Sequence, residues 1–166
     1  MNFIKTLLLI TVFTLGFTAV NAQSKVAHIN SEELIASMPE FKALQSKLEK
    51  LAKSYQDEVT ASETELKAKY QRYDIEAANQ TAETNATREK EVQLGAQKLE
   101  QYKAAAMQDI QKQEQDGMLP IYEKAKKAIE EVAAAQGYEY VLNANTLVVA
   151  KGKDLLADVK AKLGVL

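Results

Sequence analysis

The feature that most constrains this fold is a 39-residue segment, Glu40–Ala78, that contains neither glycine nor proline. Without either residue to break it, the segment predicts one continuous α-helix. At about 1.5 Å of rise per residue, such a helix is roughly 58 Å long. A chain of this size cannot enclose a helix of that length in a compact domain. We therefore expect the helix to project from the rest of the protein as an arm.

The apolar residues of this helix repeat every eleven positions rather than every seven. They fall into two registers with this spacing, Leu44–Tyr55–Leu66–Ala77 and Leu48–Val59–Tyr70. Eleven residues in three turns correspond to about 3.67 residues per turn, close to the natural 3.6. The apolar stripe should therefore run almost straight along the helix.

A polar stretch, Asp74–Glu91, ends this pattern, and we place the tip of a helical hairpin near residues 79–85. A return helix is predicted after the tip, because large apolar residues again lie eleven apart at Leu99, Ile110, Ile121 and Val132. Two long helices with one period and a polar connection predict an antiparallel hairpin. The predicted arm comprises residues 40–116.

Two positions in the return helix predict a weak point at the base of the arm. Gly117 and Pro120 are expected to interrupt the helix, and Pro120 should kink it because a proline ring clashes with the preceding turn. Pro39 lies at about the same height on the outgoing helix. We therefore predict that Pro39, Gly117 and Pro120 form a hinge.

The two ends of the mature chain, residues 23–39 and 117–166, are predicted to form a small β-containing body. Val26–Ile29 is expected to form a strand, and Asn30 to cap a short helix that ends at Pro39. After a C-cap at Gly137, Tyr138–Ala150 is expected to form a hairpin of two strands. Asp154–Leu163 should then form a final amphipathic helix.

Three short strands have too little apolar surface to be stable alone, so we expect the body to self-associate. The residues predicted to mediate this oligomerisation are the apolar strand residues Val26, Ile29, Tyr140, Leu142, Leu147, Val148 and Val149.

The first 22 residues are predicted to be a cleavable signal peptide. Lys5 precedes an uncharged apolar run, Thr6–Ala19, and the small residues of Val20–Ala22 suit a signal peptidase. The run is short for a membrane span, so stable membrane insertion is not expected, although a retained N-terminal anchor is the alternative. The mature chain should begin at about Gln23. It contains no cysteine, which excludes disulfides and cysteine-based metal sites.

Residue content also argues against several classes of function. His28 is the only histidine and has no neighbouring set of residues typical of a catalytic triad or a metal site, so we expect no enzyme, no metal and no cofactor. The mature chain carries 20 basic and 23 acidic residues, which does not favour nucleic-acid binding. The glycosylation sequons at Asn79 and Asn85 are more simply read as an exposed polar tip.

Both ends of the mature sequence resemble those of the Skp/OmpH family of periplasmic chaperones. The N-terminal part is "KVAHINSEELIASMPEFKALQSKLEKLAKSYQDEV", from Lys25, and the C-terminal part is "YEYVLNANTLVVAKGKDLLADVKAKLG", from Tyr138. The resemblance implies a jellyfish-shaped homotrimer in the periplasm, with a small β-barrel body and three helical-hairpin arms around a cavity. It also implies that the protein holds unfolded outer-membrane β-barrel proteins, its clients, soluble without ATP.

Under this interpretation the apolar stripes of the arm bind the clients. The candidate residues are Leu51, Tyr55, Val59, Leu66, Tyr70, Tyr73, Val92, Leu99, Tyr102, Met107 and Ile110. Ordinary packing between the two helices is the alternative role for these residues. The arm has 12 basic and 15 acidic residues, which argues against lipopolysaccharide or phospholipid binding. An alternative function is a periplasmic scaffold that binds one folded envelope partner.

Overall fold

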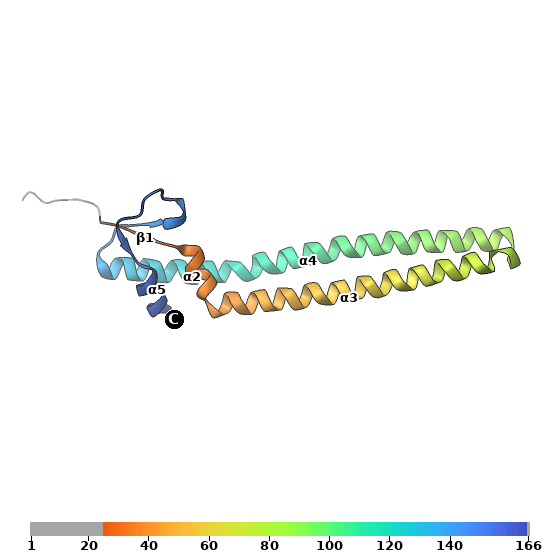
Figure 1. Cartoon of the computed structure of the whole chain (residues 1–166), viewed down its shortest axis with the longest axis horizontal. Coiled ribbons are helices and arrows are strands. Elements are labelled where there is room, and N and C mark those ends of the chain that lie inside the picture. Colours follow the sequence, from red (N-terminus) through yellow and green to blue (C-terminus); the bar gives the residue numbers. More distant parts are fainter. Residues whose placement is uncertain (1–24, 166) are drawn as a thin grey trace, which may run out of the picture.

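The computed structural model describes residues 25–165, so the predicted signal peptide, residues 1–22, lies outside the described residues. A long arm of two helices extends from a small body that contains three strands and the shorter helices (Figure 1). The fold is mainly helical with a small β-containing body, as predicted from the sequence.

The arm is an antiparallel hairpin in which α3 (Pro39–Glu76) lies beside α4 (Ala82–Gln136), and α4 continues past the start of α3 into the body (Figure 1). The outgoing helix is continuous, as predicted for Glu40–Ala78, but it begins one residue earlier and ends two residues earlier than predicted. A short 3-10 helix, η1 (Ala77–Asn79), turns the chain at the tip. The Thr81 hydroxyl caps α4 by accepting a hydrogen bond from the Thr84 N–H at 3.1 Å. Because of this cap, the return helix begins inside the region 79–85 predicted as the tip.

The predicted interruption of the return helix is wrong, because α4 continues without a break through Gly117 and Pro120. Proline removes one backbone hydrogen bond from a helix, and packing of the following turns can offset this loss. Here Ile121 and Ala125, in the two turns after the proline, are buried in the core of the body. A kink and a hinge at Pro120 stay predictions.

The chain enters the arm through β1 (Val26–Ile29) and α2 (Ser31–Ser37). Asn30 caps α2, since its side chain accepts a hydrogen bond from the Glu33 N–H at 3.0 Å. Met38 is extended (φ −70°, ψ 133°), the conformation favoured before proline, and Pro39 is the first residue of α3. The predicted stop and restart of the helix at Pro39 is confirmed.

The sheet contains β2 (Tyr140–Asn143), β1 and β3 (Lys153–Asp154) in the order β2-β1-β3, and both ladders are parallel. The predicted hairpin within Tyr138–Ala150 is therefore wrong. After β2 the chain forms the 3-10 helix η2 (Ala144–Thr146), where Asn143 Oδ1 accepts a hydrogen bond from the Asn145 N–H at 3.2 Å. It then crosses to the far side of β1. In the single chain the sheet is open and does not close into a barrel.

The core lies where α2, α4 and α5 (Leu156–Leu163) meet one face of the sheet. Leu34, Met38, Leu155 and Val159 are the largest fully buried side chains. Each buried aliphatic side chain of this kind stabilises the fold by about 1.5–3 kcal/mol. Gly137 (φ 73°) and Gly164 (φ 69°) end α4 and α5 in the left-handed conformation, which confirms the predicted cap at Gly137.

Candidate functional site

The seam between α3 and α4 is built from large residues on α3 that face glycines on α4. A Cβ added at Gly117 would lie 3.0 Å from Leu44 Cδ2, and one added at Gly95 would lie 2.8 Å from Leu66 Cδ1. Leu66 follows Leu44 by 22 residues, and Gly95 precedes Gly117 by the same number. The eleven-residue period therefore sets how the two helices pack, with each leucine filling the space that a missing side chain leaves.

Polar contacts across the seam follow the same period. Lys47 Nζ donates to Gln113 Oε1 at 2.8 Å, and Lys69 Nζ pairs with Glu91 Oε1 at 2.8 Å. The Tyr102 hydroxyl donates to Glu58 Oε2 midway between these two contacts. Lys47, Glu58 and Lys69 are eleven residues apart, and so are their partners on α4. These polar contacts flank the apolar seam and fix the register of the hairpin.

Three of the four predicted tyrosines, Tyr55, Tyr73 and Tyr102, face the seam and donate hydrogen bonds to carboxylates on the opposite helix, whereas Tyr70 is exposed. The Tyr55 and Tyr102 rings meet edge to face, with centroids 6.0 Å apart, and the Tyr55 hydroxyl donates to Asp109 Oδ2 at 2.8 Å. The hydrogen bond to the Glu58 carboxylate raises the pKa of Tyr102 to about 12. The hydrogen bond to Asp109 also raises the pKa of Tyr55 above its ordinary value.

Tyr73 and Arg88 form a similar cluster near the tip. The Tyr73 hydroxyl donates to Glu91 Oε2 at 2.7 Å, and the Arg88 guanidinium lies over the Tyr73 ring, 4.5 Å from its centroid. Arg88 also pairs with Glu76 at 2.7 Å. The tyrosines thus have a packing role in the hairpin.

Most of the predicted client-binding residues are half-buried at the seam. Of the eleven, Val59 is buried, and Tyr70 and Met107 are exposed to 58% and 73%; the half-buried residues are Leu51, Tyr55, Leu66, Tyr73, Val92, Leu99, Tyr102 and Ile110. The structure brings several of them together in shallow grooves. A groove of about 380 Å³ is lined by Leu66, Leu99 and Tyr102 together with Gly95. A second groove, of about 540 Å³, is lined by Tyr70, Tyr73 and Val92 nearer the tip.

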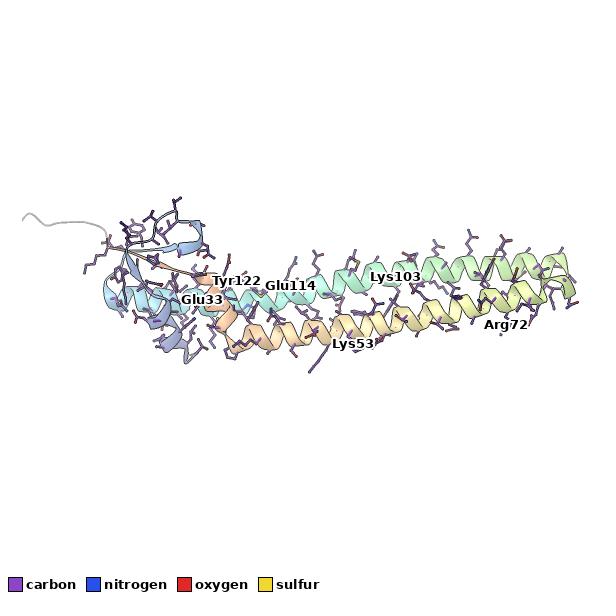
Figure 2. The ribbon with its side chains drawn as sticks, in the orientation of Figure 1. Glu33, Lys53, Arg72, Lys103, Glu114 and Tyr122 are labelled. Carbon is purple, nitrogen blue, oxygen red and sulfur yellow. The ribbon has the colours of Figure 1, made fainter. Side chains whose placement is uncertain are left out.

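Sequence reasoning missed four large apolar residues that the arm exposes: Ile75, Leu94, Leu119 and Tyr122. Tyr122 lies where the arm meets the body (Figure 2). These residues fall outside the eleven-residue stripe that packs the seam, so a search for the stripe passes over them. They could have been found as large apolar residues at positions where the eleven-residue period predicts exposed side chains.

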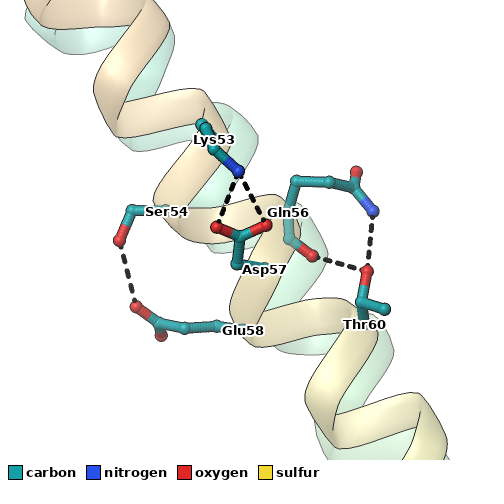
Figure 3. Close-up of polar contacts among 6 residues, drawn as sticks. All are labelled: Lys53, Ser54, Gln56, Asp57, Glu58 and Thr60. Atoms are coloured by element: carbon teal, nitrogen blue, oxygen red, sulfur yellow. Dashed lines mark hydrogen bonds and ion pairs between the residues drawn. The ribbon is translucent and has the colours of Figure 1, made fainter.

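The two helices of the arm differ in what they expose. Among the described residues, α3 exposes no large apolar side chain before Tyr70, whereas α4 exposes Leu94, Met107, Leu119 and Tyr122. In the middle of α3 the outer side carries contacts between residues four apart, such as Lys53 with Asp57 at 3.0 Å and Gln56 with Thr60 at 3.2 Å (Figure 3). Exposed apolar surface on the arm is therefore concentrated on α4 and near the tip.

The predicted oligomerisation residues lie mainly on the surface of the body. Val26, Tyr140, Leu142, Val148 and Val149 are exposed and Leu147 is half-buried. Ile29 differs, because it is buried and points into the core of its own chain.

His28 is a structural residue of the sheet. Its Nε2 lies 3.2 Å from the Gly152 carbonyl oxygen, on the segment between β2 and β3. Within residues 25–165, no group of three or more histidine, cysteine or acidic side chains is arranged to hold a metal ion. In the same part of the chain, no helix combines the length and the apolar character needed to cross a membrane.

The sequence matches a known family model over residues 25–163, and that family is described as outer membrane protein (OmpH-like). It is 26% identical to the chaperone protein Skp of Pectobacterium atrosepticum over 142 residues, covering 85% of this chain and 86% of the relative. It is 28% identical to the chaperone protein Skp of Photorhabdus luminescens over 147 residues, covering 87% and 89%.

The fold is also found in solved structures. The crystal structure of an OmpH-like protein of Caulobacter crescentus CB15, assigned as an outer membrane chaperone, superposes with a TM-score of 0.78 and 19% sequence identity. The match covers 86% of this chain and 85% of that one.

Proposed function

Because the chain belongs to the OmpH-like outer membrane protein family, we propose that it is an ATP-independent holdase for unfolded outer-membrane β-barrel proteins in the periplasm. The observation that carries the proposal is a family match over residues 25–163 on a fold whose arm exposes apolar side chains far from any core. The named relatives are chaperones, and the proposed role is binding rather than catalysis.

The surface of the arm suits weak contact with many different unfolded segments. Exposed apolar residues such as Leu94, Met107 and Leu119 are separated by charged and amide side chains, so no single contact is large. Methionine and tyrosine adapt to varied partners because one is flexible and the other is apolar with a polar end. A protein that binds only unfolded clients lowers the concentration of free unfolded client by mass action, and this needs no nucleotide.

The proposal includes a trimer held together by the body. The sheet has two open edges in the single chain, at β2 and β3, and one of its faces exposes Val26, Tyr140 and Leu142. Joining the sheets of neighbouring chains edge to edge would cover the open edges and the exposed apolar face. Three arms that extend from one body would then surround a cavity for the client.

Light scattering of a diluted, denatured outer-membrane β-barrel protein tests the function. The mature chain should suppress aggregation at stoichiometric amounts and without ATP. No suppression at a threefold excess of protomer would refute the proposal.

Matched variants test whether clients contact the exposed apolar residues of the arm. Met107→Gln combined with Leu119→Gln should weaken suppression, because both side chains are exposed on α4, whereas Ser54→Ala on the polar side of α3 should not. A scaffold with one folded partner is the alternative function. It would leave unrelated unfolded clients to aggregate and capture a single folded protein from an envelope extract.

A further inference from the structure

The segment that joins β2 to β3 presents an apolar projection on the body. Val148 is fully exposed (101%) and Val149 is exposed to 65%, although both are aliphatic. No charged residue occurs from Val141 to Ala150. Adjacent exposed aliphatic residues in an uncharged segment are typical of a protein–protein contact.

A groove of about 500 Å³ opens on another part of the same body, between the sheet, α2 and α4. Its apolar lining comes from all three, and includes Ile29, Ile35, Tyr122, Ile129 and Val141. Lys126, Glu130 and Glu139 also line it. The groove can therefore take a small aliphatic segment with a charge beside it.

The projection of one chain lies outside the groove of the same chain. Val148 and Val149 are exposed, and none of residues 147–149 lines the groove. Gly152, at the end of the segment, is in contact with His28, whereas the adjacent residue Ile29 lines the groove on the opposite face of β1. The projection is therefore free to contact another copy of the chain.

Charges near the two features are complementary. Lys151 follows the projection, and Glu139 lines the groove. Neither side chain has an ion-pair partner among residues 25–165, in contrast to Lys153, which pairs with Asp158 at 2.8 Å. A lysine beside one apolar surface and a glutamate in the other, neither with an ion-pair partner among residues 25–165, favour a contact between copies of this chain.

We propose that Leu147–Val149 of one copy inserts into the groove of the next copy, with Lys151 beside Glu139 of that neighbour. This inference rests on the proposed self-association of the body and specifies how the copies meet. Each copy inserts its own Leu147–Val149 into one neighbour and accepts the same segment of another neighbour in its groove. The two contact surfaces differ, so the contact is head to tail. Such contacts form a closed ring when the rotation between copies closes.

The absence of cysteine from the sequence makes a cross-linking test direct. Full mature chains carrying Val148→Cys would be unfolded, mixed with chains carrying Ile129→Cys or Val141→Cys, refolded together and oxidised. Disulfide-linked pairs should form in these mixtures. They should not form with Val148→Cys alone, or with a Ser54→Cys partner, whose cysteine lies on the outer side of α3.

Two outcomes overturn the proposal. Val148→Cys chains that cross-link to one another indicate a symmetric contact instead. An oligomer of unchanged mass that gives no disulfide with either groove variant excludes insertion into the groove. Aggregation suppression is measured separately, so a failed cross-link with suppression retained refutes the contact and leaves the proposed function standing.

Exchanging the charges of Lys151 and Glu139 tests the same contact between copies without changing Val148 or Val149. Lys151→Glu should raise the apparent dissociation constant of the oligomer roughly two- to fivefold, the range expected for losing an exposed ion pair. Adding Glu139→Lys should restore it, whereas adding Glu123→Lys on the exposed surface of α4 should not. Association that is unchanged by Lys151→Glu, or not restored by Glu139→Lys, contradicts the proposed pairing.

Discussion

At the scale of single residues, the tyrosines of the arm show how one side chain serves packing and polar pairing together. The ring of Tyr102 meets Tyr55 in the seam, and its hydroxyl donates to Glu58 on the opposite helix. An apolar ring with one polar end suits a two-helix seam, where one side of each residue is buried and the other is in contact with water.

The Tyr102–Glu58 contact predicts a pH dependence at the alkaline end. The carboxylate favours the protonated phenol and raises the pKa of Tyr102 to about 12, from 10.0. A pKa raised in the folded state contributes stability below the unfolded value, and that contribution is lost as the pH rises from about 10 to about 12. Glu58→Gln should lower the pKa of Tyr102 toward 10, as measured by tyrosinate absorbance during alkaline titration. Glu49→Gln, on the exposed side of α3, is the control, and a titration curve unchanged by Glu58→Gln would contradict the contact.

At the scale of elements, the arm depends on matching large residues of α3 with glycines of α4. Leu44 contacts the position where a side chain on residue 117 would begin, and Leu66 does the same at residue 95. Gly117 therefore acts as a packing residue in a continuous helix, whereas the sequence suggested a point of interruption.

Gly117→Ala should destabilise the protein in spite of alanine's higher helix propensity. The new methyl group would press on three carbon atoms of Leu44, which is buried, and overpacking of this kind costs about 1–3 kcal/mol. Gly95→Ala meets only the end of the Leu66 side chain, which can move aside, so its cost should be smaller. Urea denaturation of both variants measures the difference, and a Gly117→Ala variant at least as stable as the native protein would contradict the packing described.

Most helix limits and caps could be predicted from the sequence because the signals are local, although the interruption predicted at Gly117 and Pro120 is wrong. Pro39, Asn30 and Gly137 each act on their own backbone, and the eleven-residue period follows from helix geometry. The strand pairing could not be predicted in this way. Two strands close in sequence suggested a hairpin, but β1 from the other end of the chain lies between them. Which chain segment takes the central position is decided by contacts between segments far apart in the sequence, which a local pattern does not encode.

The candidate site was predicted in part. Repetition identified the residues of the arm stripe, but it could not say which of them pack the seam and which remain exposed. Leu94 and Leu119 were missed for the complementary reason, since they break the repeat and lie on the outside. Exposure depends on the partner helix, whose register was unknown from the sequence.

At the scale of the whole molecule, a small body has to hold a much longer arm. The core of the body is formed by α2, α4, α5 and one face of the sheet, and ion pairs such as Lys160–Glu33 (2.8 Å) and Lys162–Glu131 (2.9 Å) join its helices at the surface. Exposed ion pairs of this kind add little stability. Under the proposed self-association, contacts between bodies would add to the stability that this core supplies.

Val148→Asp should dissociate the oligomer, because it places a charge on the most exposed apolar residue of the body. Asn79→Ala at the tip of the arm should leave the assembly intact. Mass measurement in solution across a concentration series would distinguish these outcomes. A Val148→Asp protein that keeps the native mass at low concentration would place the interface elsewhere.

The eleven-residue period of the seam, with its leucine–glycine pairs two periods apart, also limits how the arm can change in length. Removing a few residues from one helix alone would set Leu44 or Leu66 against side chains instead of glycines. Removing eleven residues from each helix would keep every remaining pair in place and shorten the arm by about 16 Å. The arm can therefore change in length only in steps of eleven residues per helix. Sequences that evolve from this one can lengthen or shorten the arm by paired insertions or deletions of that size on both sides of the tip.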